Sequence, residues 1–439
     1  MKKIMIYTSV VSAILAVMLL VSCGHTHSTS VTDCTLDKIC EECGEIIEQA
    51  KEHTPASPAT CLDDSVCSVC AATVEKARGH MPNVENATCR TEKMCTVCST
   101  LLEGKTEHSY IATADGKSSK CVSCENTINY KNGMTSFIPE TQNTGHYSNN
   151  ISAYYAGSVL VCGNYGLEYF RLSEKGNAPY AQIVNDFAAK YPSLNITSLL
   201  IPKACAFLSP SGYSDGEENQ RNFINATYAM MSDSVKKADC MGELSAHKGE
   251  YTYYRTDHHW TSLGAYYASR AYCNVNGITP RELSDYETVI NTGYTGSLYS
   301  FSGGASYLKT NPDYSVAHLP AAEYKMTYTV GNTVYNGQLL NTKTNNYSIM
   351  FICGDQPFTH ITTSNTTGRK LIVFKESYGN AFVPYMADYY DEIIVIDIRK
   401  DTQSVEAIIA NYGITDALII NNVQGATSLQ NYLRTKVMS

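Results

Sequence analysis

The sequence predicts an α/β domain with a mainly parallel sheet, preceded by a row of small cysteine-rich modules. Beyond residue 150, short apolar segments alternate with amphipathic ones, the order in which strands and helices follow one another in such a sheet. Before residue 129, cysteines recur at a fixed spacing, which is typical of tandem repeats. A third observation is the stretch YYRTDHHWTSLGAYY at 253–267, which gathers two histidines, a carboxylate and the only tryptophan.

Length and charge narrow the possible classes of protein. The 439 residues suffice for two or three domains, and the hydrophobic fraction of 44% is ordinary for a globular chain. The net charge of -9 is spread without a basic run, which argues against a nucleic-acid surface or a polybasic membrane patch. The 33 tyrosines could stack on sugar rings, although a compositional bias explains them equally well.

Residues 1–22 have the pattern of an export signal. Lys2 and Lys3 precede an apolar run at 10–21 that is too short for a comfortable membrane span. The run ends in LVSCG at 20–24, which resembles the lipobox of bacterial lipoproteins and makes Cys23 the expected lipidation site. The predicted location is therefore extracytoplasmic, with a lipid anchor in the bacterial cell membrane. The alternative is an ordinary signal peptide with an incidental cysteine.

Residues 23–128 contain a cysteine module with a period of 27 to 28 residues. Each complete copy has the pattern Cys-x5-Cys-x2-Cys with a histidine ten residues later. The three copies are Cys34, Cys40, Cys43 and His53; Cys61, Cys67, Cys70 and His80; and Cys89, Cys95, Cys98 and His108. A degenerate fourth copy keeps only Cys121 and Cys124, as terminal repeats often do.

Units of this size need a metal or disulfides, because they bury too little apolar surface to fold without them. Three thiolates and an imidazole per repeat suit tetrahedral zinc, so we expect one zinc per complete repeat, three in all. One alternative is disulfides or a mixed redox state, since export favours disulfides, although the array has an odd number of cysteines, eleven. Free thiols are the other alternative. Successive Cys-x2-Cys pairs of adjacent repeats could also share a metal. The array resembles cysteine-rich repeats that serve bacterial surface proteins as stalks or spacers.

A linker is expected at 129–150, and the main domain at 151–439. Strands are expected at 158–162, 196–201, 235–239, 370–374, 392–396 and 417–420. Helices are expected at 180–190, 219–231, 262–274, 380–389 and 404–412. A region at about 285–367, rich in Tyr, Thr, Asn and Gly, is expected to form a strand-rich insertion.

The carboxyl ends of parallel strands are where α/β proteins place their sites, so the residues after each late strand are informative. Ser377 follows the strand at 370–374 in a strand-to-helix turn, although a serine there is more often a helix N-cap. Asp397 and Arg399 follow the next strand, and Asn421 and Asn422 follow the last.

Upstream, Asp257 lies two residues before His259, a spacing at which a carboxylate can fix an imidazole tautomer. Thr261 or Ser262 is expected to cap the helix that begins there. A core histidine beside a helix cap is the less specific interpretation of this stretch.

Two blocks of sequence carry a family resemblance. The block YRTDHHWT at 254–261 with GAY at 264–266, and KESYGN at 375–380 with Pro384, resemble the signatures of the DHHW family of exported bacterial proteins. That family is similar to the SGNH-like domains of exported alginate acetyltransferases. The resemblance implies a three-layer SGNH-like fold in circularly permuted order, with Ser377 as nucleophile, His259 as general base and Asp257 as its orienting carboxylate.

The same resemblance implies the oxyanion donors. They would be the amide of Ser377, a group of Arg399, and Asn421 or Asn422. The chain departs from the usual SGNH pattern in having Arg399 where glycine is common and Glu-Ser-Tyr where Gly-Asp-Ser is usual.

The implied activity is acyl transfer on acetyl esters of cell-surface or extracellular polysaccharide, with no catalytic cofactor. The last acceptor, a sugar hydroxyl or water, separates an O-acetyltransferase from an acetylesterase. The expected partners are a glycan, the membrane through the lipid, and a membrane acyl-transfer protein, but no nucleic acid. One alternative is a non-catalytic glycan-binding surface protein. Another makes His258 and His259 metal ligands, although adjacent histidines point apart on most backbones.

Overall fold

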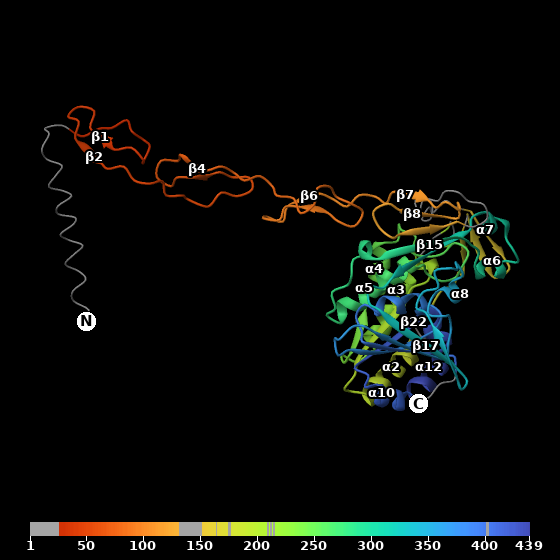
Figure 1. Cartoon of the computed structure of the whole chain (residues 1–439). Helices are drawn as coiled ribbons and strands as arrows, with labels where there is room; N and C mark the ends of the chain where they lie inside the picture. The colour runs from red at the N-terminus through yellow and green to blue at the C-terminus, as the bar shows by residue number, and fades with distance from the viewer. Residues whose placement is uncertain are drawn as a thin grey trace, which may run out of the picture. The chain divides into compact units, whose positions relative to one another are not determined.

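A computed structural model describes residues 26–130, 152–163, 165–173, 177–208, 210, 213, 216–400 and 404–439. The predicted signal, Cys23 and nearly all of the predicted linker lie outside the described residues. The chain divides into two compact units, Met1–Glu107 and His108–Ser439 (Figure 1). We call them the repeat unit and the α/β unit. No helix among the described residues combines the length and the apolarity that crossing a membrane requires.

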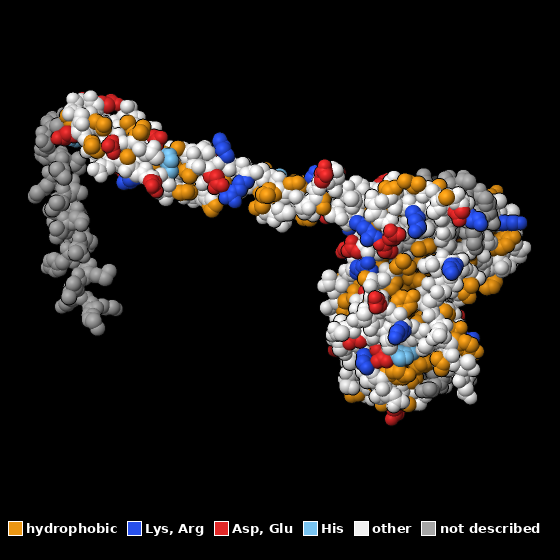
Figure 2. Space-filling view, in the orientation of Figure 1, with side chains coloured by type: hydrophobic (Ala, Val, Ile, Leu, Met, Phe, Trp, Pro, Cys, Tyr) orange, Lys and Arg blue, Asp and Glu red, His pale blue; other side chains and the backbone are white. Residues whose placement is uncertain are grey.

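The described part of the repeat unit contains three short antiparallel hairpins. They are β1 (Lys38–Ile39) with β2 (Ile46–Glu48), β3 (Ser65–Val66) with β4 (Thr73–Glu75), and β5 (Lys93–Met94) with β6 (Leu101–Glu103). Each hairpin encloses the Cys-x2-Cys pair of one repeat. In the described part of this unit, the buried apolar side chains are six cysteines and two alanines, while larger ones such as Leu62 and Val69 are exposed. Figure 2 shows hydrophobic side chains on the surface of this unit.

The segment before each later hairpin pairs with that hairpin. Pro55 bridges Cys67, and Pro82 bridges Cys95, in isolated antiparallel pairs. Backbone hydrogen bonds of 2.8 Å from Ala56 to Val66 and of 2.9 Å from Ser68 to Thr54 flank the first bridge. The chain leaving one repeat is therefore held to the hairpin of the next.

The α/β unit is organised around a mixed eight-stranded sheet in the order β14-β13-β22-β20-β21-β19-β17-β18. The first five strands are parallel, and the last three pair antiparallel. Their bounds are β13 (Asn195–Ile201), β14 (Val235–Ala238), β17 (Tyr324–Val330), β18 (Thr333–Gly337), β19 (Phe358–Thr363), β20 (Lys370–Lys375), β21 (Glu392–Asp397) and β22 (Asp416–Asn422). The near-continuous apolar sequences of β20, β21 and β22 suit strands that are buried on both faces.

Helices cover this sheet in packed groups. Helix α5 (Ser262–Val275) packs against α4 (Cys240–Ala246) and α9 (Gly379–Met386). Helix α2 (Ala178–Lys190) packs against α3 (Gly216–Ala229) and α12 (Gln430–Val437). Further helices of this unit are α10 (Val405–Tyr412), α11 (Val423–Ser428) and the 3-10 helices η2 (Ala204–Ala206) and η3 (Leu283–Asp285). All of the predicted helices are present, within a few residues of their expected ends.

The region expected as an insertion is divided between two sheets. Strands β17, β18 and β19 extend the large sheet. Strands β15 (Glu287–Tyr294) and β16 (Asp313–Leu319) form a second sheet with β9 (Thr127–Asn129), β8 (Ser118–Cys121) and β7 (Tyr110–Ala112) of the degenerate repeat. Because β9 pairs with β15, the fourth copy is part of the α/β unit. Short helices α6 (Ser297–Phe301), α7 (Ser306–Thr310) and α8 (Tyr347–Met350) complete the region.

The strand expected at 158–162 forms, as β11 (Val159–Cys162), but outside the large sheet. It lies between β10 (Ala153–Ala156) and β12 (Tyr165–Leu167) in a separate antiparallel sheet. Val159 and Val161 of β11 pack against Leu298 of α6 and Leu308 of α7, which accounts for the apolar character of this strand.

Candidate active site and metal centres

Ser377 lies in the turn between β20 and α9, at the carboxyl edge of the parallel strands. The turn is tight: a Cβ on Gly379 would lie 2.5 Å from that of Lys375, so the backbone course there requires glycine. Its amide hydrogen bonds run from Gly379 to the carbonyl of Glu376 (2.9 Å) and from Asn380 to that of Ser377 (3.1 Å). The half-buried Ser377 hydroxyl is thereby presented at the edge of the sheet.

The histidine segment is fixed just before α5. Thr261 caps that helix by accepting the amide of Gly264 (3.3 Å), as predicted. Trp260 donates its indole N–H to the carbonyl of Tyr378 (2.9 Å), which ties this segment to the turn that carries Ser377. Two stretches of chain 118 residues apart are thus held side by side.

The structure brings the three predicted catalytic residues into one hydrogen-bonded relay. His259 Nε2 lies 2.8 Å from Ser377 Oγ, and His259 Nδ1 lies 2.6 Å from Asp257 Oδ1. Asp257 and His259 are both 5% exposed. The relay therefore has the order serine, imidazole, carboxylate, with only the serine end open to solvent.

Asp257 is held by donors on both oxygens. Oδ1 also accepts the backbone amide of His259 (3.0 Å), and Oδ2 accepts the hydroxyl of Tyr294 (2.8 Å) and the amide of Ser297 (2.9 Å). Burial alone would raise the pKa of Asp257, but the imidazoles and these donors lower it well below its usual range. The carboxyl group is therefore ionised at neutral pH and fixed in orientation.

His258 packs against His259, with 3.9 Å between the ring centroids, so the expectation that the two side chains point apart is wrong. Its Nδ1 lies 2.6 Å from Ser297 Oγ. Burial and the neighbouring His259 lower the pKa of His258 to about 3, so the ring is neutral at pH 7. Asp257, His258 and His259 lie close enough to hold a metal ion, but both ring nitrogens of His259 are taken by hydrogen bonds.

The predicted oxyanion donors differ in what they already bind. Arg399 donates its backbone N–H, Nε and Nη2 to Asp397 at 2.6 to 3.0 Å, and Nη2 also contacts Asp355 (2.8 Å). The amide of Asn422 donates to Glu376 Oε1 (3.0 Å). Asn421 accepts the hydroxyl of Tyr180 (3.2 Å), and its buried Nδ2 has no hydrogen-bond partner among the described residues. The Arg399 side chain is therefore already engaged, whereas Asn421 keeps an unused donor.

Lys203 was not predicted as a site residue, although it follows β13 as Ser377 follows β20. It is 5% exposed, forms an ion pair with Glu168, and contacts Gln424 Oε1 (3.1 Å). Its Nζ lies 5.8 Å from the ring centroid of Tyr378. The rule about strand ends would have found Lys203, whereas no pattern marks Tyr294 within the Tyr-rich region.

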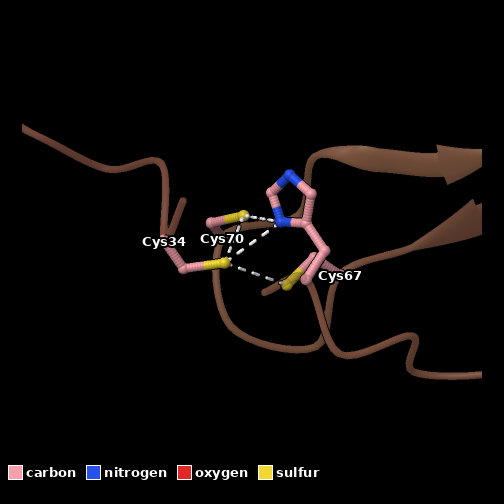
Figure 3. Close-up of side chains that lie close together, drawn as sticks. Cys34, Cys67 and Cys70 are labelled. Atoms are coloured by element: carbon pink, nitrogen blue, oxygen red, sulfur yellow. Dashed lines mark hydrogen bonds between the residues drawn. The ribbon is translucent and has the colours of Figure 1, made fainter. Parts of the chain in front are cut away.

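The first complete group of metal-ligating residues combines two repeats. Cys34 Sγ lies 3.1 Å from His53 Nδ1, 3.5 Å from Cys67 Sγ and 3.4 Å from Cys70 Sγ (Figure 3). A disulfide would need about 2.05 Å between sulfurs, whereas Zn–S bonds of about 2.3 Å in a tetrahedron place sulfurs roughly 3.8 Å apart. The spacing fits a metal better than a covalent bridge.

The second group repeats the same arrangement. Cys61 Sγ lies 3.6 Å from Cys95 Sγ, and Cys98 Sγ lies 3.4 Å from His80 Nδ1; all four ligand atoms are within 4.8 Å of one another. The ligands are thus grouped differently from the prediction. The first cysteine and the histidine of one repeat meet the Cys-x2-Cys pair of the next, rather than the pair of their own repeat.

Both ends of the array contain further candidate ligands. His27, which was not predicted, lies with Cys40 and Cys43 within 4.8 Å. In the α/β unit, Cys124 Sγ lies 3.4 Å from His108 Nδ1, and Cys121 is beside them. Cys89 is buried in the repeat unit.

The thiols of a group differ in acidity. Backbone amides of Cys70 and Val69 lower the pKa of Cys67 to about 5, whereas burial and the neighbouring thiols raise the pKa of Cys34 to about 12. Cys95 and Cys61 repeat the pattern, with pKa values of about 5 and about 12. A divalent cation would stabilise all of these thiolates together, so the donor set fits zinc.

Comparisons with known proteins agree with the family resemblance. The family model described as DHHW protein matches residues 117–396. A crystal structure of a DHHW family protein from Eubacterium siraeum is 31% identical, with a TM-score of 0.62 over 66% of this chain and 100% of that chain. No curated protein matches the chain.

A more distant structure also shares the fold. Bacillus cereus PatB1 with sulfonyl adduct is 17% identical, with a TM-score of 0.52 over 64% of this chain and 98% of that one. The O-acetyltransferase domain of Pseudomonas putida AlgJ is 13% identical over 65% of this chain and 99% of that one, and its TM-score of 0.34 is too low to bear on the fold.

Proposed function

Because the chain belongs to the DHHW protein family, we propose that its α/β unit is a serine-dependent enzyme acting on acetyl esters of polysaccharide. The observation that carries the proposal is the 2.8 Å contact between His259 Nε2 and Ser377 Oγ, with Asp257 behind the imidazole. The proposal includes an SGNH-like domain in circularly permuted order, in which the histidine precedes the serine. Acetyl transfer to a sugar and hydrolysis of an acetyl ester share this apparatus.

The reaction proceeds in two halves. His259 Nε2 takes the proton of Ser377 as Oγ attacks the acetyl carbonyl, and Asp257 stabilises the imidazolium that forms. Collapse of the tetrahedral intermediate expels the leaving alcohol, which receives the proton from His259. In the second half a sugar hydroxyl or water loses its proton to His259 and attacks the acetyl-enzyme. Ser377 is released as His259 returns a proton to its Oγ.

The negative charge on the carbonyl oxygen needs donors fixed in advance. We assign this role to the backbone amide of Ser377 and, among the predicted side chains, to Asn421, whose Nδ2 has no hydrogen-bond partner among the described residues. Arg399 is better suited to neutralising Asp397 and Asp355, which it already contacts. Replacing Asn421 by Ala should then lower turnover about 10²-fold or more, and replacing Arg399 by Lys should lower it less.

Turnover of a chromogenic acetyl ester tests the proposal. Ser377→Ala and His259→Ala should each lower kcat/KM at least ~10³-fold, and Asp257→Asn somewhat less, whereas Ser234→Ala, an exposed control, should match the wild type. Mass spectrometry should find an acetyl group on Ser377. The proposal is refuted if the wild type turns over no acetyl ester or glycan acceptor, or if Ser377→Ala has the same turnover as the wild type. The non-catalytic glycan-binding alternative would then stand.

We further propose that the cysteine array binds structural zinc. The Cys3His groups leave no ligand position open for substrate, so the metal braces the repeats and takes no part in the chemistry. Metal analysis of the protein purified without reductant decides between zinc and disulfides. Zinc with titratable thiols after its removal supports the proposal, and no metal with no free thiols refutes it.

The last part of the proposal is that the protein is exported and lipid-anchored at Cys23. This part rests on the sequence of residues 1–24 alone. The expected setting is the outer face of the bacterial cell membrane, where a membrane acyl-transfer partner could supply acetyl groups. Fractionation of cells that express Cys23→Ser is the test. If this variant still partitions with membranes, the anchor is not the lipid.

A further inference from the structure

Residues 345–355, between β18 and β19, contact the turn of Ser377 from two sides; we call them the clamp segment. Tyr347, its first aromatic residue, is 1% exposed. Its ring lies parallel to the imidazole of His259, with 4.0 Å between centroids and 12° between planes. Its hydroxyl donates to the carbonyl oxygens of Ser377 (3.1 Å) and Tyr378 (3.3 Å). One side chain therefore touches both the base and the backbone of the nucleophile.

Asp355, the last residue of the clamp segment, contacts the residues that flank the nucleophile. Its Oδ1 accepts from Lys375 Nζ and from Asn380 Nδ2, both at 2.9 Å. Its Oδ2 pairs with Arg399 (2.8 Å). Burial alone would raise the pKa of Asp355, but the two cations lower it below its usual range. The carboxylate thus holds both ends of the turn that presents Ser377.

The backbone of the clamp segment is held in an unusual conformation. Ile352 and Cys353 have positive φ values of 47° and 57°, and Gly354 has 82°. A β-branched residue adopts positive φ only when its surroundings enforce it. The amide of Ile352 donates to the carbonyl of Leu339 (2.8 Å), and a Cβ on Gly354 would lie 2.3 Å from the carbonyl oxygen of Ser348. This path brings Tyr347 and Asp355 to the same turn.

We propose that Tyr347 and Asp355 are positioning residues for acyl transfer, an inference that rests on the proposed function. The tyrosine ring keeps the imidazole in line with Ser377 Oγ, and its π face stabilises the imidazolium that forms when His259 takes the serine proton. Asp355 keeps the turn from relaxing, so that Oγ stays at hydrogen-bonding distance. Because Tyr347 lies against His259 and Asp355 against Lys375 and Asn380, their loss lowers kcat and leaves KM nearly unchanged.

Three variants separate these contributions in acetyl-ester turnover by the full chain. Tyr347→Leu removes the ring and should lower kcat about 10²-fold, with KM within about twofold of wild type. Tyr347→Phe keeps the stacked ring and loses only the hydroxyl, so it should recover kcat to within about tenfold of wild type. Asp355→Asn keeps the size of the side chain and should lower kcat about tenfold.

Tyr272→Leu is the matched control, because Tyr272 is equally buried but its hydroxyl contacts Tyr390. It should lower the melting temperature as much as Tyr347→Leu does and leave kcat unchanged. Wild-type kcat in Tyr347→Leu and Asp355→Asn, or a rise in KM in place of the fall in kcat, would overturn the inference. If Tyr347→Leu does not fold, Asp355→Asn decides, and wild-type kcat in that variant overturns the inference. Absence of turnover in the wild type would instead refute the proposed function, and this inference with it.

Discussion

The repeat unit and the α/β unit are stabilised by different chemistry. In the described part of the repeat unit, the buried apolar side chains are cysteines and alanines, while Leu62 and Val69 are 73% and 68% exposed. In the α/β unit, the apolar residues of β20, β21 and β22 are almost completely buried, and so is Trp260. Buried apolar surface thus organises the α/β unit, whereas the described repeat unit is organised around groups of thiols and imidazoles that are positioned to hold a metal.

Removal of the proposed metal should produce the largest difference between the two units. In the presence of a reductant and a strong chelator, the amides of the repeat unit should lose their protection from hydrogen exchange, because two-stranded hairpins of this size are not stable alone. The amides of β20 and β22 should keep theirs. Hydrogen exchange with mass spectrometry reads both units in one sample. Release by reductant alone, before any chelator, would point to disulfides.

Paired cysteine substitutions test which ligands share a metal in the repeat unit. Cys34 and Cys67 lie in one group, whereas Cys61 and Cys67 lie in two. The double variant Cys34→Ser with Cys67→Ser should therefore lose one equivalent of zinc. Cys61→Ser with Cys67→Ser should lose two. Metal analysis would give the reverse order if each repeat held its own metal.

Deletion of a large apolar side chain should affect the two units unequally. Phe187 is fully buried against Phe374, so Phe187→Ala should cost about 3–5 kcal/mol in the α/β unit. Leu62→Ala on the repeat unit should change stability by no more than ~0.5 kcal/mol. Denaturant titration followed by the fluorescence of Trp260, the only tryptophan, measures the first. Hydrogen exchange of the repeat unit measures the second. A large cost at Leu62 would contradict the assignment of a metal-based fold.

A pH dependence of stability is expected from one buried histidine of the α/β unit. Burial lowers the pKa of His318 to about 3. The unfolded chain then binds a proton below about pH 6.5 that the folded chain does not, so stability is complete above that pH and falls as the pH decreases toward 3. His318→Gln should reduce this slope by about one proton. Equal slopes in urea titrations of both proteins between pH 6.5 and 4.5 would show that His318 takes up its proton in the folded state.

Sequence reasoning reached the strands and helices of the α/β unit and the proximity of Ser377, His259 and Asp257. It succeeded because strand ends meet at one edge of a parallel sheet, whatever the distance along the chain. It could not reach Tyr347 or Asp355, since their contacts depend on an irregular path with positive φ values that no periodicity records. The mixed character of the sheet was missed because β17 and β19 carry too few apolar residues to be distinguished from an insertion.

The grouping of metal ligands was beyond sequence reasoning for another reason. Every complete repeat contains three cysteines and one histidine at the same spacing. The sequence pattern is therefore the same whether the four ligands of a site come from one repeat or from two neighbouring repeats. Only the backbone pairing of Pro55 with Cys67, and of Pro82 with Cys95, selects the second arrangement. The oxyanion assignment of Arg399 likewise depended on contacts with Asp397 and Asp355 that the sequence does not reveal.

The sharing of ligands between neighbours also bears on how such an array changes by gene duplication. An added copy of 27 to 28 residues brings one Cys-x2-Cys pair to complete the site before it, and one cysteine and histidine to begin the next. The number of sites then grows by one with each copy, and no ligand is left over. By its sequence, an array of this kind needs only a Cys-x2-Cys pair to end it, and the degenerate copy keeps such a pair, Cys121 and Cys124. Related proteins can therefore differ in length by whole periods without any change in the α/β unit that follows.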